Sequence, residues 1–336
     1  MIKIGIIGTG YWGKHHIRIF SKLPCQLVGI ADIDKTKESL AREYNIKFFT
    51  DFNKLLNTVD AISIVTPPST HFDIAKKALT VGKHVFIEKP FVLKRKEALE
   101  LESLRKAKNL ILMVGHIFLY HPAIIELKKI IEKGDLGQIY YIISQRLNLG
   151  IVRHDVNSLW NFAPHDLSII IYLLGKMPKE VECIGQSYLQ NNLEDIIFLT
   201  LKFSNKILAH IILSWLHPSK IRELTIVGSK KMAVFNDLNT NTPLTVYDKG
   251  IDRQRLGKDT QWKNFTDFKM KTRYGEIITP QVKSGEPLEF ELEHFLNCIK
   301  TLSQPRSDGE NGLKVITILE AATKSLKEGG KIIDIK

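Results

Sequence analysis

Cysteine is scarce in this sequence. Cys25, Cys183 and Cys298 are the only three cysteines in 336 residues, and they lie far apart. An odd number of distant cysteines argues against a framework of disulfide bonds and against a cysteine zinc site. We therefore expect a cytoplasmic protein, in a reducing compartment, that holds no structural metal.

Long hydrophobic runs and internal repeats are also missing. No apolar stretch reaches the about 18 residues that a membrane-spanning helix needs, so we expect no membrane association. The composition, with 44% hydrophobic and 25% charged residues, is ordinary for a globular protein. A length of 336 residues is enough for two domains, each with its own core.

The sequence also has no long basic block, although its net charge is +12 from 48 Lys and Arg against 36 Asp and Glu. The positive charges are scattered, and pairs such as Lys76-Lys77 are typical of solvated helix faces. A scattered excess fits anionic small molecules better than a nucleic-acid surface. We therefore expect no nucleic-acid partner.

What the sequence does contain is a regular alternation of strand and helix patterns over its first 118 residues. The predicted strands are 2–7, 26–31, 47–49, 60–65, 84–87 and 111–116, and the predicted helices are 14–22, 35–44, 52–57, 71–80 and 94–108. Such alternation predicts a doubly wound parallel sheet of the α/β class. We assign residues 1–118 to one domain of this class, which the family resemblance described below implies to be a dinucleotide-binding Rossmann domain.

A glycine-rich turn follows the first predicted strand, with the sequence Gly8-Thr9-Gly10-Tyr11-Trp12-Gly13. In a G-x-G-x-x-G turn the first glycine allows the tight turn and the second lets the backbone approach a pyrophosphate. The third lets helix and strand pack closely. The helix that follows would direct its N-terminus at the phosphates. The hexamer alone is a common pattern, but its position between strand and helix is the one that cofactor binding requires.

Asp32 ends the second predicted strand, 22 residues after Gly10. This spacing is close to that of the carboxylate that binds the adenosine ribose hydroxyls. Asp32 and Asp34 together would repel a 2′-phosphate, which favours NAD over NADP, whereas Lys35 and Lys37 could accommodate one. Asp32 could instead be only a helix cap, a role that does not exclude ribose binding.

Two further turns lie at the carboxyl ends of predicted strands, where ligands of open α/β sheets bind. One is Thr66-Pro67-Pro68 with His71 shortly after it, and the other is Glu88-Lys89-Pro90. A lysine at such a strand end can meet a bound cofactor. The alternative is an ordinary surface Glu-Lys pair before a turn.

The glycine-rich turn, Thr66-Pro67-Pro68 with His71, and Glu88-Lys89-Pro90, in this order, resemble the Gfo/Idh/MocA oxidoreductase family over essentially the whole chain. The resemblance implies a second, α+β domain at 119–336 with a large, mostly antiparallel open sheet, and a homodimer or homotetramer. It also implies that Lys89 lies beside the nicotinamide and the substrate. The implied cofactor-binding residues are Gly8, Thr9, Gly10, Tyr11, Trp12, Gly13, Asp32, Thr66, Pro67, His71, Glu88 and Lys89.

The second half reads as strands in series with four helices. The predicted strands are 138–146, 181–190, 195–203, 207–215, 220–228, 229–235, 242–247 and 331–335, and the predicted helices are 120–133, 167–174, 287–302 and 312–329. Residues 257–275 show no clear periodicity and suggest a long loop or edge. Strands in series indicate an antiparallel or mixed sheet.

His165 lies ten residues before Gly175, a spacing that resembles the second signature of the family. The family often has an aspartate four residues before this histidine, but here Asn161 occupies that position, and an amide cannot accept a proton. How Lys89 and His165 divide proton transfer is therefore open. The alternative for His165 is a histidine at a helix start that is bonded to the backbone.

Alcohol oxidation requires a base within about 2.6–3.2 Å of the hydroxyl group. Burial and a nearby positive charge make a lysine ammonium a stronger acid, so Lys89 could act as base in oxidation or as acid in reduction. A histidine side chain already exchanges protons near neutral pH. We therefore predict Lys89 and His165 as the catalytic pair of an NAD(P)-dependent dehydrogenase acting on CH–OH groups.

The polar stretch before His165 resembles family members that oxidise nucleotide sugars such as UDP-N-acetylglucosamine at C3. Their keto products are transaminated to amino sugars for surface glycans, which implies a paired aminotransferase. An arginine in this stretch could bind a phosphate or carboxylate, and a solvated loop is an equal alternative. The predicted substrate-binding residues are Lys89, Tyr120, Arg146, Arg153, Asn157, Trp160, Asn161 and His165. An inositol or free-sugar dehydrogenase and a non-catalytic NAD-binding regulator are the alternatives in function.

Overall fold

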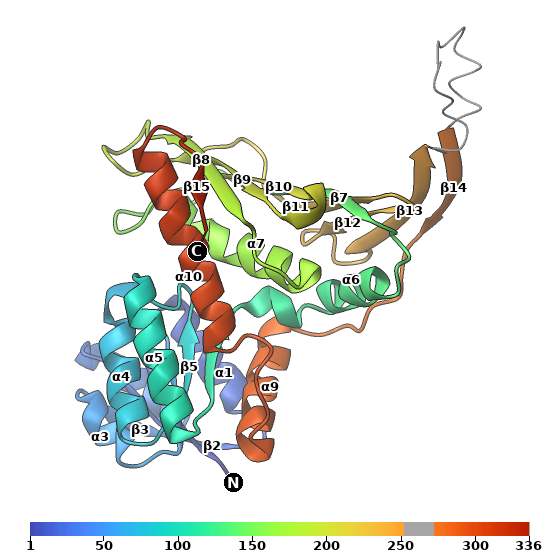
Figure 1. The fold of residues 1–336 in the computed structure, drawn as a ribbon. Helices are drawn as coiled ribbons and strands as arrows, with labels where there is room; N and C mark the ends of the chain where they lie inside the picture. The colour runs from blue at the N-terminus through green and yellow to red at the C-terminus, as the bar shows by residue number, and fades with distance from the viewer. Residues whose placement is uncertain (252–271, 336) are drawn as a thin grey trace, which may run out of the picture. The chain divides into compact units, whose positions relative to one another are not determined.

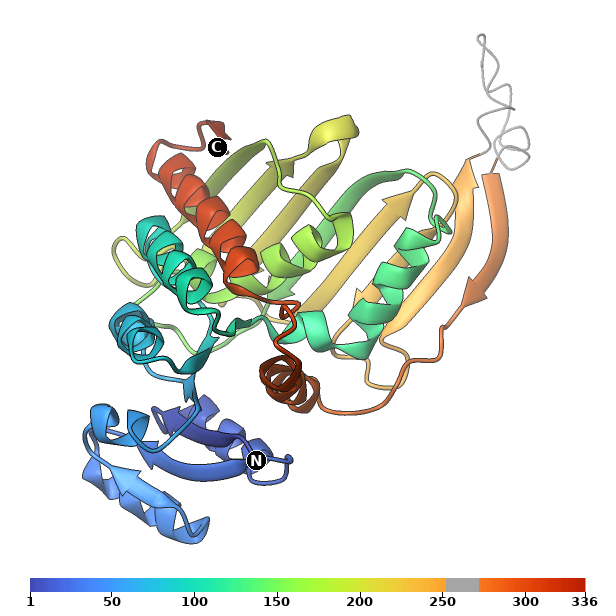
Figure 2. The same ribbon diagram turned by 60° about the horizontal axis from the view of Figure 1, so that its bottom comes forward.

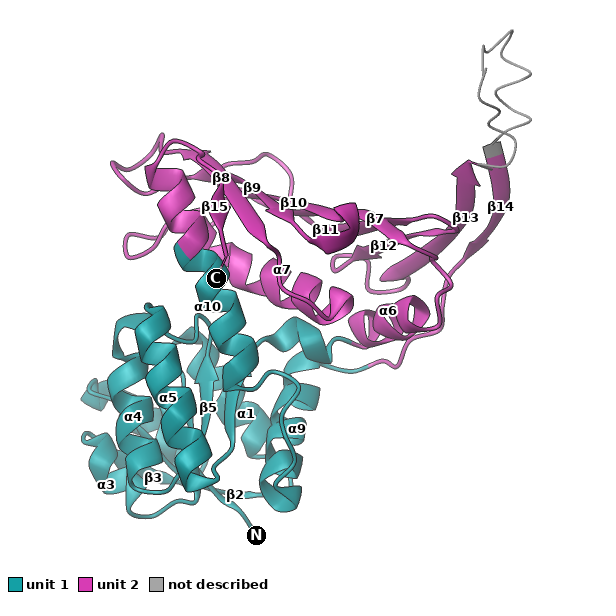
Figure 3. Ribbon diagram, viewed as in Figure 1, with its two compact units in different colours: residues 1–121, 285–320 teal, residues 122–284, 321–336 magenta. Residues whose placement is uncertain are grey.

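The computed structural model describes residues 1–251 and 272–335, shown in two views in Figures 1 and 2. The chain forms two compact units, coloured separately in Figure 3. The first contains residues 1–121 and 285–320, and the second contains residues 122–284 and 321–336. The first unit thus ends three residues after the predicted boundary and includes a later segment that the sequence analysis assigned to the second domain.

The first unit is built on a six-stranded parallel sheet in the order β3-β2-β1-β4-β5-β6. Its strands are β1 (Lys3–Ile7), β2 (Gln26–Ala31), β3 (Lys47–Phe49), β4 (Ala61–Ile64), β5 (His84–Glu88) and β6 (Leu112–Gly115). This is the strand order of dinucleotide-binding sheets, which confirms the predicted fold class. Ile4, Ile6 and Ile62 have no exposed surface, as expected for strands that are covered on both faces.

Helices connect these strands, as the alternating pattern predicted. They are α1 (Tyr11–Phe20), α2 (Glu38–Glu43), α3 (Phe52–Leu56), α4 (His71–Thr80), α5 (Arg95–Lys108) and the short 3₁₀ turns η1 (Lys35–Lys37), η2 (Pro68–Thr70) and η3 (Ile117–Tyr120). The predicted helix at 35–44 is divided into η1 and α2. Asp34 caps the first of these by accepting the Thr36 N–H.

Residues 285–320 complete the first unit through α9 (Pro287–Thr301) and the segment after it. The ring of Phe295 on α9 lies edge-on to that of Phe86 on β5, with centroids 5.8 Å apart. The backbone N–H of Val114 on β6 donates to the carbonyl of Ser307 at 2.7 Å. The periodicity of this region predicted an amphipathic helix, but periodicity does not reveal which core the apolar face joins.

The second unit contains a nine-stranded sheet in the order β14-β13-β12-β11-β7-β10-β9-β8-β15. The strands are β7 (Ile139–Leu147), β8 (Glu180–Gln186), β9 (Ile196–Lys202), β10 (Leu208–Ser214), β11 (Ile221–Gly228), β12 (Met232–Asn236), β13 (Leu244–Ile251), β14 (Thr272–Ile278) and β15 (Ile333–Asp334). All neighbours are antiparallel except β7 and β10, so the sheet is mostly antiparallel, as predicted. Most of the predicted loop at 257–275 lies outside the described residues, and its last four residues belong to β14.

Helices α6 (Pro122–Glu132) and α7 (Ser158–Leu174) lie on one face of this sheet (Figures 1 and 2). Helix α10 (Gly309–Lys327) begins in the first unit and ends in the second. Helix α7 begins nine residues before the predicted start at 167, because the Asn157 side chain caps it by accepting the Trp160 N–H. Pro164 lies inside α7, although proline removes a helical hydrogen bond.

No α-helix covers the other face of the nine-stranded sheet among the residues described. Strand alternation places Tyr141, Ile143, Phe198, Leu208 and Ile212 on this face. Tyr141 and Leu208 are cross-strand partners with exposed fractions of 42% and 47%. Within the described chain, no helix has both the length and the apolarity to span a bilayer.

Candidate active site

The glycine-rich turn connects β1 to α1 with a tight approach to neighbouring backbone. Gly8 has φ +91°, and a Cβ atom there would lie 2.7 Å from the Val65 carbonyl oxygen. A Cβ atom on Gly13 would lie 2.3 Å from the Gly8 carbonyl oxygen. Both positions therefore require glycine, one because of its positive φ and the other because helix and turn touch.

The second glycine of the motif differs from the other two. A Cβ atom on Gly10 would meet no atom within 4 Å among the described residues. Gly10 is the N-cap of α1, and no side chain caps that helix. The space beside Gly10 and the uncapped amides suit an anionic group, so the residues present fit the pyrophosphate of a dinucleotide. Tyr11 and Trp12 flank this turn with exposed side chains.

Asp32 is fixed beside the turn by three hydrogen bonds. Its Oδ2 accepts from the Thr9 amide at 2.8 Å and from the Thr9 hydroxyl at 2.6 Å. Its Oδ1 accepts from the Asp34 amide at 3.0 Å. The carboxylate is half-buried at the end of β2, where it can accept further hydrogen bonds from a ribose.

The basic residues near Asp32 are partly neutralised. Lys37 Nζ lies 3.4 Å from a carboxylate oxygen of Asp34. Hydrogen bonds from Thr36 to the Asp34 carboxylate hold the pKa of Asp34 below its usual value, so this charge persists at neutral pH. The region therefore has two carboxylates, those of Asp32 and Asp34, and one of its lysines is paired with Asp34.

Glu88 and Lys89 follow β5, and buried side chains hold Glu88 in place. His16 Nε2 lies 3.0 Å from Glu88 Oε1, and His16 Nδ1 lies 2.9 Å from the Ser63 hydroxyl. The Lys89 amide donates to Glu88 Oε2 at 3.1 Å. Burial favours the neutral acid, but the hydrogen bonds with His16 and the Lys89 amide, together with the positive charge of Lys89, hold the pKa of Glu88 below its usual value. The turn that carries Lys89 thus rests on a half-buried carboxylate that a buried histidine holds.

His71 connects the two proline turns from inside the first unit. Its Nδ1 lies 2.9 Å from the Pro90 carbonyl oxygen, and its Nε2 lies 2.9 Å from the Thr66 carbonyl oxygen. Burial lowers the pKa of His71 despite these two acceptors, which favours a neutral ring. A neutral imidazole has one N–H and can donate to only one of the two carbonyls. His71 therefore lies in the interior between the two turns, where it contacts the backbone of both and has no exposed surface.

In the second unit, His165 and Asn161 lie four residues apart on α7, which places them on one face of the helix. Both are half-buried. The neighbouring Asp166 points to the sheet and accepts from Arg146 Nε at 2.9 Å and from the Ser144 hydroxyl at 2.8 Å. The Arg146–Asp166 ion pair is buried, so this arginine connects β7 to α7 within the unit.

The remaining predicted substrate residues of this unit lie at or before the start of α7. Arg153 forms an exposed pair with Asp155 at 2.5 Å. Asn157 caps α7, and its Nδ2 donates to Glu194 at 2.6 Å. Trp160 Nε1 donates to the Thr323 hydroxyl at 3.0 Å. These contacts position the helix start. The Arg153 side chain is 40% exposed, whereas that of Arg146 is 8% exposed.

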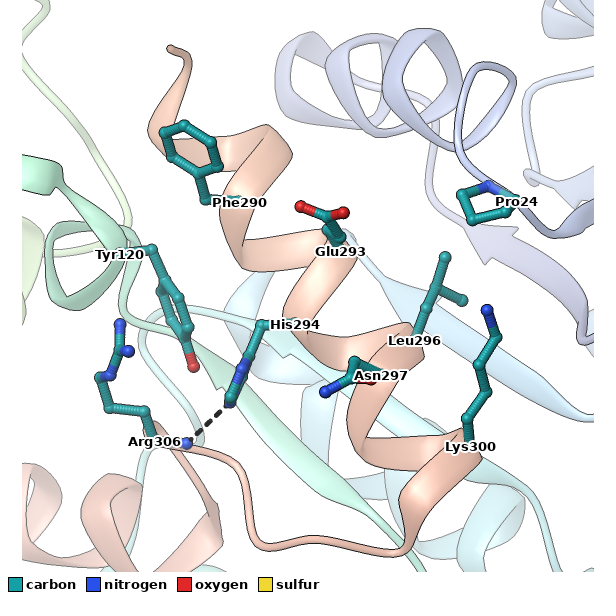
Figure 4. Close-up of a pocket in the computed structure, with 9 residues that line it drawn as sticks. All are labelled: Pro24, Tyr120, Phe290, Glu293, His294, Leu296, Asn297, Lys300 and Arg306. Atoms are coloured by element: carbon teal, nitrogen blue, oxygen red, sulfur yellow. Dashed lines mark hydrogen bonds between the residues drawn. The ribbon is translucent and has the colours of Figure 1, made fainter. Parts of the chain in front are cut away.

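Tyr120 is the one predicted site residue that lines a pocket beside α9 (Figure 4). The pocket has a volume of about 380 Å³. Tyr120 itself is 2% exposed, its hydroxyl lies 3.0 Å from the Ser307 hydroxyl, and the Arg306 guanidinium lies 5.0 Å from its ring centroid. Burial raises the pKa of Tyr120 far above its usual value, so the phenol stays neutral.

Sequence reasoning missed His16, Ser63 and Glu291. His16 and Glu88 are separated by 72 residues, and no local motif connects them. A signal was nevertheless present, because His16 lies among Ile17, Ile19 and Phe20 on the buried side of α1. A polar residue on an otherwise apolar helix face requires a buried partner.

Comparison with known proteins assigns the family. The NAD-binding Rossmann-fold model of the Gfo/Idh/MocA oxidoreductase family matches residues 2–116, and its C-terminal alpha/beta domain model matches residues 128–333. The chain belongs to the Gfo/Idh/MocA oxidoreductase family, as its motifs predicted.

Individual relatives share this architecture. The chain is 31% identical over 317 residues to UDP-N-acetylglucosamine 3-dehydrogenase of Acidithiobacillus ferrooxidans, which covers 94% of each chain. A crystal form of that protein superposes with a TM-score of 0.82 and 27% identity, covering 97% of this chain and 98% of the other. The chain is also 31% identical over 185 residues to scyllo-inositol 2-dehydrogenase (NAD(+)) of Bacillus subtilis, which covers 52% of this chain and 54% of that protein.

Proposed function

We propose that this protein is an NAD-dependent dehydrogenase that oxidises C3 of a nucleotide sugar such as UDP-N-acetylglucosamine. The observation that carries the proposal is the similarity to a UDP-N-acetylglucosamine 3-dehydrogenase, which extends over 94% of both chains. The product would be a 3-keto sugar, a substrate for an aminotransferase in amino-sugar or surface-glycan synthesis. A cytoplasmic location stays a prediction that rests on the low cysteine content.

The chemistry assigns separate tasks to named residues. Bound NAD would supply the hydride acceptor. Gly10 and the start of α1 would hold the pyrophosphate, and Asp32 would accept the ribose hydroxyls. Thr66, Pro67 and Glu88 would border the cofactor, with His71 supporting the turns from behind. Lys89 and His165 would exchange the proton of the substrate hydroxyl, which must leave as the carbonyl forms.

Asp32 and Asp34 support NAD as the cofactor, because two carboxylates disfavour a 2′-phosphate. Lys37 is already paired with Asp34, which reduces its capacity to bind that phosphate. Lys35 is exposed and could still do so. Parallel assays with NAD and NADP test the preference, and a higher kcat/KM with NADP would contradict it.

The test of the activity measures absorbance at 340 nm with purified protein, NAD and UDP-N-acetylglucosamine. Alcohol oxidation by NAD is usually unfavourable, so the assay includes an aminotransferase with its amino donor or a carbonyl trap. We expect NADH to accumulate only when the UDP-sugar is present. No NADH despite confirmed NAD binding would refute this substrate.

Lys89→Ala and His165→Ala test the two proton-transfer roles. Positioned general acid–base groups contribute about 10²–10⁴-fold, so each variant should lose about 100-fold or more in kcat. Binding of NAD, measured by calorimetry, should be retained in His165→Ala and largely retained in Lys89→Ala. Leu99→Ala, a change at an exposed α5 position, is the control. If either variant kept a kcat near that of wild type, the proposed proton-transfer role of that residue would be wrong.

An inositol or free-sugar dehydrogenase is the second candidate, favoured by the similarity to scyllo-inositol 2-dehydrogenase. That similarity extends over only 52% of this chain, which is why we place it second. Turnover of scyllo-inositol or a free sugar, with no turnover of the UDP-sugar, would establish it. NAD binding without turnover of any sugar in a panel would instead support a non-catalytic NAD-binding regulator.

The uncovered face of the nine-stranded sheet supports a homo-oligomer. Apolar side chains of neighbouring strands, including Tyr141, Leu208 and Ile212, gather on this face, where the described chain has no helix to bury them. Exposed apolar patches of this kind are typical of protein interfaces, and most homo-oligomers are symmetric dimers or dimers of dimers. We infer a homodimer or homotetramer that forms through this face.

A further inference from the structure

Glu291 on α9 is a buried acid for which the proposed function has no task. Its side chain has no exposed surface. Among the described residues, neither of its carboxyl oxygens has a hydrogen-bond partner. An ionised carboxylate in such a place would lose its hydration without replacement, a cost that proteins normally avoid by keeping the group neutral.

The surrounding elements bring Glu291 close to the turn that carries Lys89. Glu291 and Phe295 are four residues apart, on one face of α9. The Phe295 ring contacts that of Phe86, and Phe86 shares its side of β5 with Glu88, two residues later. Burial, and then the charge of Glu88, raise the pKa of Glu291 well above its usual value. A buried acid, Glu291, and a half-buried acid, Glu88, therefore lie within electrostatic reach of one another.

The donors around the two acids decide which of them is ionised. Glu88 accepts from His16 and from the Lys89 amide, and both bonds favour its anionic form. Glu291 has no comparable donor in the described chain. The proton of the pair is thus expected on Glu291 and the charge on Glu88.

We propose that Glu291 is a positioning residue of the Lys89 turn, which holds one proton so that the Glu88–Glu291 pair carries a single negative charge, located on Glu88. The negative charge of Glu88 would then stabilise the Lys89 ammonium. Because Glu291 would be protonated, no second negative charge would lie next to Glu88. The part of this inference that concerns Lys89 rests on the proposed function. The titratable and charged groups that interact with Glu88 or Glu291 are His16, His71, Lys89, His116 and Tyr120. His294 and Arg306 lie one step further away, beside Tyr120.

The first test measures thermal unfolding of the full chain without cofactor or substrate between pH 5 and pH 8.5. Above the ordinary pKa of a glutamate, the unfolded chain releases the Glu291 proton while the folded protein retains it. Stability contributed by this site is therefore complete at low pH and is lost as pH rises. Glu291→Gln keeps a neutral amide of the same shape, so its Tm relative to wild type should increase by about 3 °C or more over this range.

A double-mutant cycle assigns this effect to Glu88. In the Glu88→Gln background, Glu291 no longer faces a negative charge, so Glu291→Gln should produce a smaller pH-dependent gain in Tm. A Tm difference between Glu291→Gln and wild type that is constant with pH would show that Glu291 does not hold the proton. An equal pH-dependent gain in Tm in the wild-type and Glu88→Gln backgrounds would show that the charge of Glu88 does not affect the protonation of Glu291. Both results overturn the proposal whatever the substrate is.

The second test uses the pH profile of kcat in sugar oxidation. Removal of the Glu88 charge makes it easier for Lys89 to lose its proton, so Glu88→Gln should move the acidic limb lower by about one pH unit. Glu291→Gln replaces one neutral group by another and should leave the profile unchanged. A similar displacement in both variants would mean that Glu291 is ionised and would overturn the proposal. Failure of the nucleotide-sugar assay alone would refute the substrate and leave the unfolding test intact.

Discussion

At the scale of single residues, the three glycines of the turn after β1 have different tasks. Gly13→Ala would place a Cβ atom 2.3 Å from the Gly8 carbonyl oxygen, so we expect a loss of stability of about 1–3 kcal/mol from overpacking. Gly10→Ala meets no described atom within 4 Å and should change stability by less than about 1 kcal/mol. Its methyl group would instead occupy the space for the pyrophosphate and raise the Kd for NAD by about tenfold or more.

Chemical denaturation and calorimetric titration with NAD separate these two effects. Gly82→Ala would be a poor control because Gly82 has φ +77°. Thr80→Ala, at an exposed position of α4, is a better one. If Gly10→Ala bound NAD as tightly as wild type, the cofactor would not approach the backbone at that position.

Two buried histidines of the first unit, His71 and His116, and two half-buried ones, His84 and His294, predict a loss of stability in mild acid. Burial lowers the pKa of His71, His84, His294 and His116, the last to about 4. The unfolded chain takes up these protons as pH falls through about 6.5, whereas the folded protein resists doing so. Stability that is present above pH 6.5 is therefore lost as pH falls toward 4, by up to about 1.4 kcal/mol per pH unit for each histidine.

Thermal unfolding between pH 7.5 and pH 4.5 measures this loss, and His116→Gln should reduce its slope. An unchanged slope would mean that His116 titrates normally in the folded protein. His154, which is exposed on the second unit, is the control position, and His154→Gln should leave the slope unaltered.

At the scale of elements, the Arg146–Asp166 pair fixes α7 to β7 within the second unit. Asp166→Asn would leave a buried guanidinium without its counter-charge, so we expect a loss of about 3–5 kcal/mol. Asp155→Asn removes the corresponding partner of Arg153 at an exposed pair and should cost about 1 kcal/mol or less. Urea unfolding of both variants checks the difference, and equal losses would contradict a structural role for the buried pair.

Much of the element pattern could be predicted because it depends on local chemistry. The strand at 26–31 and the helix at 71–80 have the predicted bounds, since a buried run and a helical period are visible in adjacent residues. The start of α7 could not be found this way, because Pro164 argues against a helix that tertiary packing nevertheless retains.

The site was predictable to a similar extent. The spacing of Gly8, Gly10, Gly13 and Asp32 is local, and the structure brings Thr9 and Asp32 together at the end of β2. The supports of Glu88 were not predictable, because His16 contacts it from α1 and Ser63 on β4 contacts His16. Whether Lys89 and His165 carry the chemistry stays a prediction.

At the scale of the whole molecule, the uncovered sheet face predicts assembly. Tyr141→Glu with Leu208→Glu would place two carboxylates on adjacent strands at the centre of the proposed interface, where burying them is costly. We expect light scattering to show a smaller assembly than wild type. Leu99→Glu adds charge at an exposed position of α5 and should leave the mass unchanged. If the double variant had the same assembly mass as wild type, this face would not be the interface between protomers.

The late segment 285–320 has a consequence for the order in which the protein can be made. Phe86 obtains its partner Phe295 only from α9, and β6 obtains the backbone contact of Ser307 only from the segment that follows. During synthesis the first unit therefore remains incomplete until residues 285–320 have also left the ribosome. A gene fragment that stops at residue 121 would encode all six strands of the parallel sheet and still lack part of their core, so the dinucleotide-binding half cannot be isolated by a single cut in the chain.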